Sequence, residues 1–588
     1  NIPGGGLYTI FSSFMLANSE FYSGCFPAEY FNTVGGIFNI KFRSGNPWKH
    51  EYSAQVGVQG LDLSAEGPLS RKNGSTFICN ARLSTMQLLK EIIPELSKRQ
   101  SAKYQDYCAK FDIPDTKIGR ISIWGIMGNS KLIQEAADDP GQWSSSDERT
   151  DASMKNLMFA SAISNEYAIG DGVSMKNTVA ITRDCRYFNY GERSPDTPEI
   201  PASDYVSDDK RTDLVLSSTL NQRLSKRTIG RYGITYKHIW DDCRCLFGSD
   251  AEMPSGFFSG TSHLIQGHAQ IKHDLSPKVT SILGGSVTYF SLARECAVEP
   301  RFGFEYKPRH NHSIAMGISL HSQIAPLYFY KMDTGQEKEN ISGSRHPLKM
   351  TRAFHLTGSY NMIVSSACRL KIEPYFQYLY NVPNLENTTF SIVNMTTLLS
   401  PAMSENSFVN NGAGINTGID VTYERFLSKG YYYMGTLSIF KSEYRDFFKD
   451  WHPTMFDARW YVNVLGGKEL TFKRKNGLYK ILGLNGHIMM SGRSPYSPVD
   501  YEKSHSSQSI VYDESRPFAC RKKGVDVMAD ISLTYMVNYK SFSGTLALQV
   551  KNLFGKQYLG QFYNMSTGAV DDMYFESPIP LLSYKIEF

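Results

Sequence analysis

The sequence predicts an all-β fold, a closed antiparallel transmembrane β-barrel that encloses a short stretch from the amino end of the chain. Two observations predict it. From residue 48 to residue 588 the chain is one long series of strand-like runs, with no convincing helical pattern between them. Before this series, residues 21–47 (FYSGCFPAEYFNTVGGIFNIKFRSGNP) form a short apolar stretch that contains several glycines.

Alternation with a period of two is the main signal for the strands. In residues 525–537, apolar side chains such as Val527 and Leu533 occupy the odd positions, and polar side chains such as Asp526 and Thr534 occupy even ones. The same alternation runs through residues 354–362 and 582–588. A soluble antiparallel sheet would alternate in the same way. The number of runs, their length of about ten residues and the alternation of short and long connections favour a membrane barrel.

The composition is consistent with this architecture. A length of 588 residues would normally suggest several soluble domains, but one large closed sheet can accommodate it. Aromatic residues make up 13% of the chain, and the 36 Tyr are of the type that prefers membrane–water interfaces. Mean hydropathy is −0.33, and no apolar run reaches the ~18 residues of a spanning helix. The net charge of +5 is too small to predict nucleic-acid binding.

The chain divides into 22 predicted strands, an even number, as a bacterial single-chain outer-membrane barrel requires. They are residues 52–60, 61–69, 75–85, 104–112, 118–128, 156–169, 174–187, 213–224, 229–239, 267–275, 279–290, 301–306, 313–322, 351–364, 369–379, 413–425, 431–442, 458–472, 479–490, 524–538, 544–552 and 581–588. Short polar turns separate them at residues 70–74, 113–117, 170–173, 225–228, 276–278, 307–312, 365–368, 426–430, 473–478 and 539–543. We expect all short connections at one end of the barrel and all long ones at the other.

The connections also predict the orientation of the barrel. Short turns face the periplasm in outer-membrane barrels, and long loops face the outside. We therefore expect the first hairpin tip, near Gly60, to be extracellular, and Phe588 to end at the periplasmic rim. A lumen enclosed by 22 strands is wide enough to need an obstruction.

The stretch at residues 21–47 carries a family resemblance. It resembles the end of the plug domain of TonB-dependent outer-membrane receptors. The matching residues are Phe26, Pro27, Ala28, Glu29, Tyr30, Asn32, Gly35, Gly36, Ile37, Asn39, Ile40, Arg43, Gly45 and Asn46. Further similarity lies at residues 63–69, 375–383, 424–432, 511–514 and 584–588. Phe31 departs from the pattern, which has Gly there, so the local turn is expected to differ because a bulky side chain disfavours positive φ.

The resemblance implies the domain organisation and the function. Residues 1–47 would be the carboxyl-terminal part of a plug domain, and residues 48–588 the barrel. The protein would import a bulky nutrient across the Gram-negative outer membrane, gated by the plug and energised through TonB and its inner-membrane complex. Outer-membrane lipid and lipopolysaccharide are implied partners, and a surface lipoprotein is a further candidate. The terminal Phe588 resembles the signal read by the barrel-assembly machinery, although an ordinary terminal strand is the alternative.

The resemblance also implies what precedes this sequence. The chain starts without an initiating Met, at Asn1-Ile2-Pro3. A signal peptide, a TonB-binding segment and most of the plug are expected upstream in the full protein.

No stretch predicts catalysis, a cofactor or a metal. The sequence contains neither a GxSxG nor an HExxH motif. The nine cysteines are scattered, and the spacing of Cys243 and Cys245 is too tight for a zinc knuckle. Asp138, Asp139, Asp147 and Asp151 could bind Ca²⁺ in principle, but their spacing is not that of an EF-hand loop. The protein is therefore predicted not to be an enzyme.

Loop aromatics are the candidate ligand contacts. They are Tyr328, Phe329, Tyr330, Tyr558, Phe562 and Tyr563. Aromatic faces suit sugars, porphyrins and peptide side chains alike, so a metal chelate, cobalamin, an oligosaccharide and a peptide remain open as substrates. Many of these rings could instead belong to the interfacial belt. Two other functions also stay open, a passive porin and a scaffold for surface lipoproteins or a larger complex.

Overall fold

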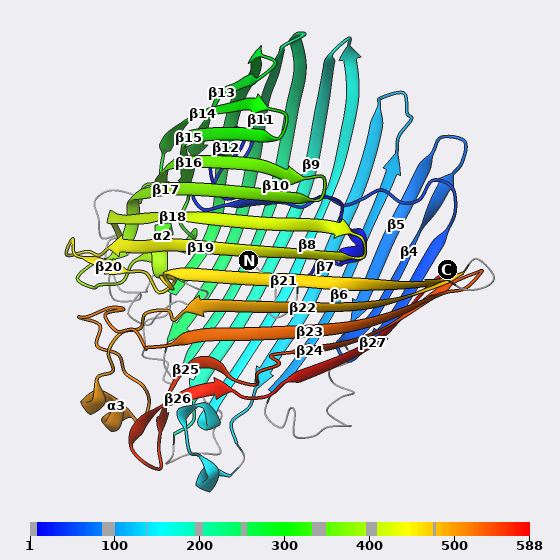
Figure 1. Cartoon of the computed structure of the whole chain (residues 1–588). Helices are drawn as coiled ribbons and strands as arrows, with labels where there is room; N and C mark the ends of the chain where they lie inside the picture. The colour runs from blue at the N-terminus through cyan, green and yellow to red at the C-terminus, as the bar shows by residue number, and fades with distance from the viewer. Residues whose placement is uncertain are drawn as a thin grey trace.

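The computed structural model is a closed β-barrel. It describes residues 9–84, 100–137, 139–194, 204–247, 256–331, 348–395, 408–473 and 478–588. Each wall strand pairs antiparallel with its neighbours in the chain, and the last strand pairs with the first to close the ring. Figure 1 shows the steep strands of one wall, in blue to green, crossing behind the strands of the opposite wall, in green to orange.

The 22 wall strands confirm the predicted count. They are β3 (Glu51–Gly57), β4 (Gly60–Ser70), β5 (Ser75–Leu83), β6 (Gln100–Ile113), β7 (Arg120–Gln134), β8 (Thr150–Gly170), β9 (Val173–Glu192), β10 (Tyr205–Ser225), β11 (Thr228–Phe247), β12 (Gly256–Ser276), β13 (Val279–Phe290), β14 (Glu295–Arg309), β15 (His312–Gln323), β16 (Thr351–Ser365), β17 (Cys368–Leu385), β18 (Phe408–Ser428), β19 (Tyr431–Arg445), β21 (Trp460–Lys473), β22 (Tyr479–Gly492), β23 (Val525–Asn538), β24 (Ser543–Lys551) and β27 (Ile579–Glu587). A short strand, β20 (Trp451–Pro453), pairs with the end of β19.

The two faces of the wall differ in polarity. Large apolar side chains stand on the outer face, for example Leu283 at 65% exposure and Val298 at 63%. The residues between them face the lumen and are often buried and charged, as Glu66, Asp106 and Glu299 are. A soluble protein does not expose so many large apolar groups, whereas lipid covers them in a membrane barrel.

The connections confirm one part of the expected pattern and correct another. We call the end of the barrel with the long connections the loop side and the other end the turn side. All connections on the turn side are short, as predicted. Two short connections, β3–β4 and β13–β14, nevertheless lie on the loop side. The predicted complete separation of short from long connections is therefore wrong at these two places.

Many strands extend further toward the loop side than the sequence predicted. β8 begins at Thr150 instead of residue 156, and β11 with β12 take up most of the predicted loop at residues 240–264. The backbone ladder between β10 and β11 continues unbroken from Tyr205 opposite Phe247 down to Arg223 opposite Ile229. Toward the loop side the strict alternation stops, because polar residues such as Asp242 and Arg244 stand on the outer face while Cys243 and Cys245 are buried on the inner face, yet the backbone pairs continue.

The loop side also carries small elements inside predicted loops. They are α2 (Tyr328–Lys331), α3 (Tyr501–Ser507) and the hairpin of β25 (Gln557–Asn564) with β26 (Ala569–Phe575). Four short 3₁₀ turns occur among the described residues, η1 (Ser13–Met15), η3 (Pro140–Gln142), η4 (Ser146–Arg149) and η5 (Ile392–Asn394). None of the helices formed by the described residues is long and apolar enough to cross a membrane.

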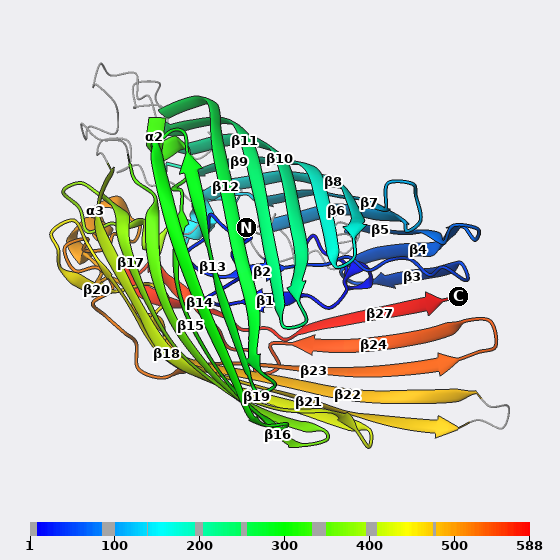
Figure 2. The same ribbon diagram turned by 90° about the horizontal axis from the view of Figure 1, so that it is seen from above.

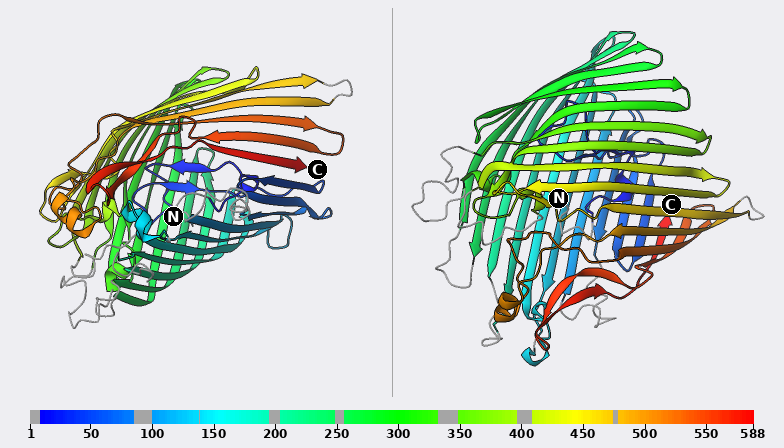
Figure 3. Two further views of the ribbon diagram at one scale, coloured as in Figure 1. Left: turned by 90° about the horizontal axis from the view of Figure 1, so that it is seen from below. Right: turned by 60° about the vertical axis from the view of Figure 1, so that its left-hand side comes forward.

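The amino-terminal segment, residues 9–47, lies inside the barrel. Its two short strands, β1 (Glu20–Tyr22) and β2 (Ile37–Asn39), pair with each other and not with the wall. Figure 2 and the left view of Figure 3 show these strands, in blue, within the ring of wall strands. The right view of Figure 3 shows α3 and the β25–β26 hairpin gathered at the loop side.

The seam that closes the barrel is short. Only five residue pairs join β27 to β3, from Ser583 opposite Gly57 to Glu587 opposite Ser53. Beyond them, the Phe588 N–H donates to the Tyr52 carbonyl at 2.9 Å and the Tyr52 N–H donates to the Phe588 carbonyl at 2.8 Å. The terminal residue therefore extends the seam by two hydrogen bonds.

We predict that deleting Phe588 weakens this seam. Two backbone hydrogen bonds are worth about 2 kcal/mol net, and the ring contact with Tyr52 is lost as well. The folded band on unboiled SDS gels should disappear at a lower temperature than in the wild type. Phe588→Trp keeps the backbone and an aromatic ring and should behave like the wild type. An unchanged transition in the deletion variant would contradict this account of the seam.

Candidate functional site

The lumenal site is centred on a buried arginine of the wall. Arg301 on β14 is 6% exposed, and its side chain reaches the backbone of the amino-terminal segment. It donates to the Phe26 carbonyl at 3.2 Å, to the Pro27 carbonyl and to the Tyr30 carbonyl at 2.9 Å. The Glu299 carboxylate pairs with it at 2.8 Å. One guanidinium thus joins the wall to a turn of the segment.

The partner carboxylate is itself fully satisfied. Glu299 is 1% exposed and accepts hydrogen bonds from Ser286 at 3.0 Å and from Ser322. A buried ion pair is tolerated only when its remaining hydrogen-bonding capacity is met, and removing one partner costs several kcal/mol. The segment carbonyls therefore supply partners for the two terminal nitrogens of the guanidinium, while its Nε has no hydrogen-bond partner among the described residues.

Two glutamines of β12 hold the next residue of the segment. The Gln270 side-chain carbonyl accepts from the Ala28 N–H at 3.0 Å, and the Gln266 amide donates to the Ala28 carbonyl at 3.0 Å. Side-chain amides thus bind both backbone groups of Ala28, as a neighbouring strand would. Ala28 is itself only 1% exposed, so its backbone groups would be costly to leave unpaired.

An aromatic cluster surrounds Phe26, which is 1% exposed. Its ring stacks on His321 with a centroid separation of 3.8 Å and meets the edge of His355 at 6.4 Å. The Arg301 guanidinium lies 5.2 Å from the ring centroid. Phe26 of the family-like pattern therefore anchors the segment to the wall through ring stacking and a cation–π contact.

The far end of this turn is held by β15 to β17. The Val34 carbonyl accepts from His355 at 3.0 Å and from Gln377, and its N–H donates to Gln323 at 3.1 Å. Asn32 adopts a positive φ of 56° and its side-chain oxygen accepts from the Ile324 N–H at 2.9 Å. Phe31, which replaces the Gly of the family pattern, does not adopt a positive φ, and the left-handed residue of the turn is Asn32, a residue type that tolerates this region.

A second anchor lies where the segment enters β3. Arg43 forms two hydrogen bonds with Glu66, at 2.8 and 2.7 Å, and Glu66 also accepts from the Asn46 N–H at 2.8 Å. Between them, a Cβ atom on Gly45 would lie 2.0 Å from the Phe77 carbonyl oxygen, so only glycine fits. These contacts give a physical reason for the Arg43, Gly45 and Asn46 part of the pattern.

A cavity of about 1020 Å³ separates the segment from the wall formed by β6 to β11. Its lining is strongly charged and includes Glu29, Lys110, Asp112, Lys176 and Arg231. Glu29 pairs with Arg231 at 2.7 Å. Burial raises the pKa of Glu29, and the Arg231 charge works against that rise. The lumen therefore contains a space lined by charged and polar groups next to the turn held by Arg301.

The structure separates the predicted loop aromatics into two groups. Phe329 and Tyr330 are buried in an apolar core at the loop side. The ring centroid of Phe329 lies 4.2 Å from that of Phe408, and the ring centroid of Tyr330 lies 5.2 Å from that of Phe290. Their role is packing beneath the loops. The side chain of Tyr328 lies outside the described residues. Tyr563 is also buried, and its hydroxyl contacts His505 at 2.9 Å.

Tyr558 belongs to a group of cations and aromatic rings that sequence reasoning missed. Arg493 and Lys522 lie 5.1 and 5.0 Å from its ring centroid. Lys522 also lies 6.0 Å from the Tyr496 ring, and burial, together with the nearby Arg493 charge, lowers the pKa of Lys522. Phe562, four residues further along β25, is half-buried. The members come from two loops far apart in sequence, so no local pattern could have revealed the group.

The remaining candidate groups make structural contacts. The Cys243 and Cys245 sulfur atoms are 3.7 Å apart within the same loop-side core. Asp151 pairs with Arg193 at 2.6 Å, and Asp139 caps the Gly141 N–H at 2.9 Å. Asp138 lies outside the described residues, as does the side chain of Asp147. No group of three metal-ligating side chains is found in the part of the chain that the structure describes.

Similar architectures occur among solved structures. The ferripyoverdine receptor of the outer membrane of Pseudomonas aeruginosa, bound to ferripyoverdine, matches with a TM-score of 0.66 and 10% identity over 95% of this chain and 74% of its own. The FrpB iron transporter from Neisseria meningitidis matches with a TM-score of 0.66 and 13% identity over 98% and 88%. The ferric yersiniabactin uptake receptor FyuA from Yersinia pestis matches with a TM-score of 0.66 and 10% identity over 94% and 82%.

These matches establish the fold. No protein-family model and no curated protein matches the sequence. The barrel nevertheless has the architecture of TonB-dependent outer-membrane receptors, which confirms the resemblance seen in the sequence. The matched proteins are receptors and transporters.

We predict that Arg301→Met releases the turn at residues 26–34. The variant loses three hydrogen bonds to the segment and leaves Glu299 buried without its cation. Amide hydrogen exchange at residues 26–34 should become at least tenfold faster. The double variant Arg301→Met/Glu299→Gln also removes the unpaired buried carboxylate. It should restore the stability of the barrel, while amide hydrogen exchange at residues 26–34 stays as fast as in the single variant. Equal exchange rates in the wild type and both variants would contradict the anchoring role of Arg301.

Proposed function

We propose that the protein is an outer-membrane receptor that imports a bulky nutrient, with residues 1–47 as the carboxyl-terminal part of a plug. One observation carries the proposal. The amino-terminal segment occupies the lumen and is attached to the wall by side chains, whereas every wall strand is attached to its neighbours by backbone ladders. Side-chain contacts of this kind can break and re-form while the barrel stays closed.

The strength of the attachment supports a need for external work. About ten hydrogen bonds join residues 26–34 to the wall, and at ~1 kcal/mol net each they hold the segment by on the order of 10 kcal/mol. A barrier of that size makes spontaneous release rare. The outer membrane has no ATP, so in this proposal the work comes from the inner membrane through TonB, acting on residues upstream of the described segment.

The loop side supplies the candidate ligand surface. Arg493 and Lys522 lie against the Tyr558 ring, and they pair with Asp526 at 3.3 Å and with Asp572, respectively. The surface therefore carries both signs of charge and suits a polar ligand with flat or unsaturated parts. The similar receptors are named for ferripyoverdine and ferric yersiniabactin. A ferric chelate is therefore the first substrate to test, followed by cobalamin, oligosaccharides and peptides.

Uptake by intact cells tests the proposal. A strain that lacks the protein should fail to accumulate the labelled substrate, and the complemented strain should accumulate it only when TonB is present. A passive porin would accumulate small solutes without TonB. Uptake that does not depend on TonB would therefore overturn the proposal in favour of the porin.

We predict that removing residues 1–47, with any residues that precede them, opens the barrel to ions. The wild type should show little conductance in a planar bilayer, because the segment and its contacts obstruct the lumen. The truncated protein should show large, stable channels. A control truncation that ends before Thr9 keeps all the described wall contacts of the segment. Closed channels after the longer truncation would show that the loops, and not the segment, seal the barrel.

We also predict that tethering the segment to β15 blocks uptake. The Cys25 sulfur lies 3.3 Å from the Ser319 hydroxyl oxygen, so Ser319→Cys places two sulfur atoms side by side. Oxidation should abolish uptake, and a reducing agent should restore it, because transport requires this contact to break. The Cys25→Ser/Ser319→Cys variant cannot form the bond and should transport normally. Full uptake by the oxidised variant would mean that the turn stays fixed during transport.

A further inference from the structure

Three lysines form a row on the outer face of the barrel. Lys103 on β6 is directly opposite Lys131 on β7, which is directly opposite Lys155 on β8. All three are exposed. They share the parity of Tyr107, Met127 and Phe159, which stand on the outer face, whereas Asp106 and Asn156 between them are buried toward the lumen. We call this group the lysine row.

The lysine row is electrostatically unfavourable by itself. Side chains directly opposite one another in a sheet have Cβ atoms about 5 Å apart, and like charges there are destabilising. Within the described residues, none of the three lysines has a carboxylate partner within 4.0 Å. Lys155 lies over the Tyr187 ring at 4.8 Å. Asp208, opposite Tyr187 in the same row, is already paired with Lys210 at 2.6 Å.

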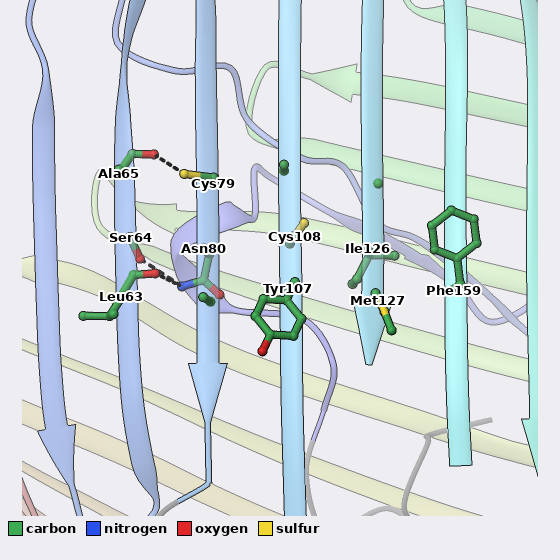
Figure 4. Close-up of a pocket in the computed structure, with 13 residues that line it drawn as sticks. Leu63, Ser64, Ala65, Cys79, Asn80, Tyr107, Cys108, Ile126, Met127 and Phe159 are labelled. Atoms are coloured by element: carbon green, nitrogen blue, oxygen red, sulfur yellow. Dashed lines mark hydrogen bonds between the residues drawn. The ribbon is translucent and has the colours of Figure 1, made fainter. Parts of the chain in front are cut away.

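An apolar hollow lies on the same strands, closer to the middle of the barrel. It has a volume of about 530 Å³ and an almost wholly apolar lining. Small residues form its floor, namely Ala65, Cys79, Ala81, Ala109 and Gly125, and larger side chains form its rim, namely Leu63, Tyr107, Met127 and Phe159. Figure 4 shows the four rim residues, with Ala65 and Cys79 of the floor, on adjacent strands of the wall.

The hollow and the lysine row are in register. The rim residues Tyr107, Met127 and Phe159 are opposite one another, as the lysines are. The two rows are four positions apart along each strand, which is about 13 Å at ~3.3 Å per residue. Gln105 and Asn129, both exposed, lie between them. On β8 the intermediate position is Leu157, opposite Asn129, so from the loop side inward the surface changes from cationic to amide to apolar on β6 and β7, and directly from cationic to apolar on β8.

We propose that this surface binds a phosphorylated, multiply acylated lipid of the lipopolysaccharide class. The lysine row neutralises the phosphates, the amides meet the sugar and ester groups, and an acyl chain fills the hollow. The lysines lie toward the loop side, which faces the outer leaflet if the proposed orientation of the barrel is right. The row spans about 10 Å across three strands, which suits more than one phosphate, and the hollow requires a chain that free phosphate lacks.

Lipid binding to purified protein tests this site. Delipidated full-length protein in detergent is titrated with deep-rough lipopolysaccharide, and the bound lipid is counted by native mass spectrometry. Lys103→Gln/Lys131→Gln/Lys155→Gln should bind at least tenfold more weakly than the wild type. Lys441→Gln/Lys468→Gln/Lys480→Gln removes three outward lysines from β19, β21 and β22 and should bind within twofold of the wild type.

A second variant tests the hollow without changing the charge. A Cβ atom on Gly125 would have its nearest neighbour at 3.7 Å, so Gly125→Leu can fill the hollow without strain in the wall. It should weaken lipopolysaccharide binding several-fold and leave its salt dependence unchanged. The wild type and the lysine variant should bind dephosphorylated lipopolysaccharide with equal affinity. The wild type should bind phosphatidylglycerol more weakly than lipopolysaccharide.

Three results would overturn the site. They are equal binding by the wild type and the lysine variant, equal binding of phosphatidylglycerol and lipopolysaccharide, and full competition by inorganic phosphate, which would indicate an unspecific anion surface. Uptake separates this inference from the proposed function. A lysine variant that reaches the outer membrane should still import the substrate of the proposed function. If the wild type failed to import any substrate, the measured lipopolysaccharide binding would still stand.

Discussion

A strand that crosses lipid must pair its backbone on both sides, because no water is present to satisfy a free edge. Twenty-two strands meet this requirement only by closing, and here closure depends on the five pairs between β27 and β3 with Phe588 beyond them. The rest of the structure follows from this constraint. A closed wall of this size encloses a lumen wider than side chains alone can fill, so the chain needs a separate filling element.

The lumenal side chains show how such an element can be held without joining the wall. Arg301, Gln266 and Gln270 bind backbone groups of the segment, and so imitate a neighbouring strand without becoming one. Each is fixed by its own place in the wall, and Arg301 is also fixed by Glu299. The contact is specific because its polar groups are buried, and any other arrangement would leave them without hydrogen-bond partners. It is also separable, because no wall ladder runs through it.

Sequence reasoning reached the strand count because lipid on one face and a polar lumen on the other impose strict alternation. It failed where that contrast ends. Above the lipid belt, residues such as Asp241 and Cys243 are inside a regular ladder, yet their neighbours no longer alternate with apolar ones. The anchor residues of the segment were visible as a family-like pattern, but their wall partners were not. Ala28 and Gln266 are separated by 238 positions, and only the closed topology brings them together.

The wall between β4 and β8 links the two faces of the molecule. On the lumenal side, Ile10 and Met15 of the segment pack against Ile78, Cys108 and Ile126. On the lipid side, the residues that alternate with these include Cys79, Ala109 and Gly125, which are small and form the floor of the hollow near the lysine row. One stretch of sheet is therefore in contact with the segment inside and, in our proposal, with an anionic lipid outside. Because both contacts use the same strands, a lipid that stiffens this wall would also stiffen the surface against which the segment packs.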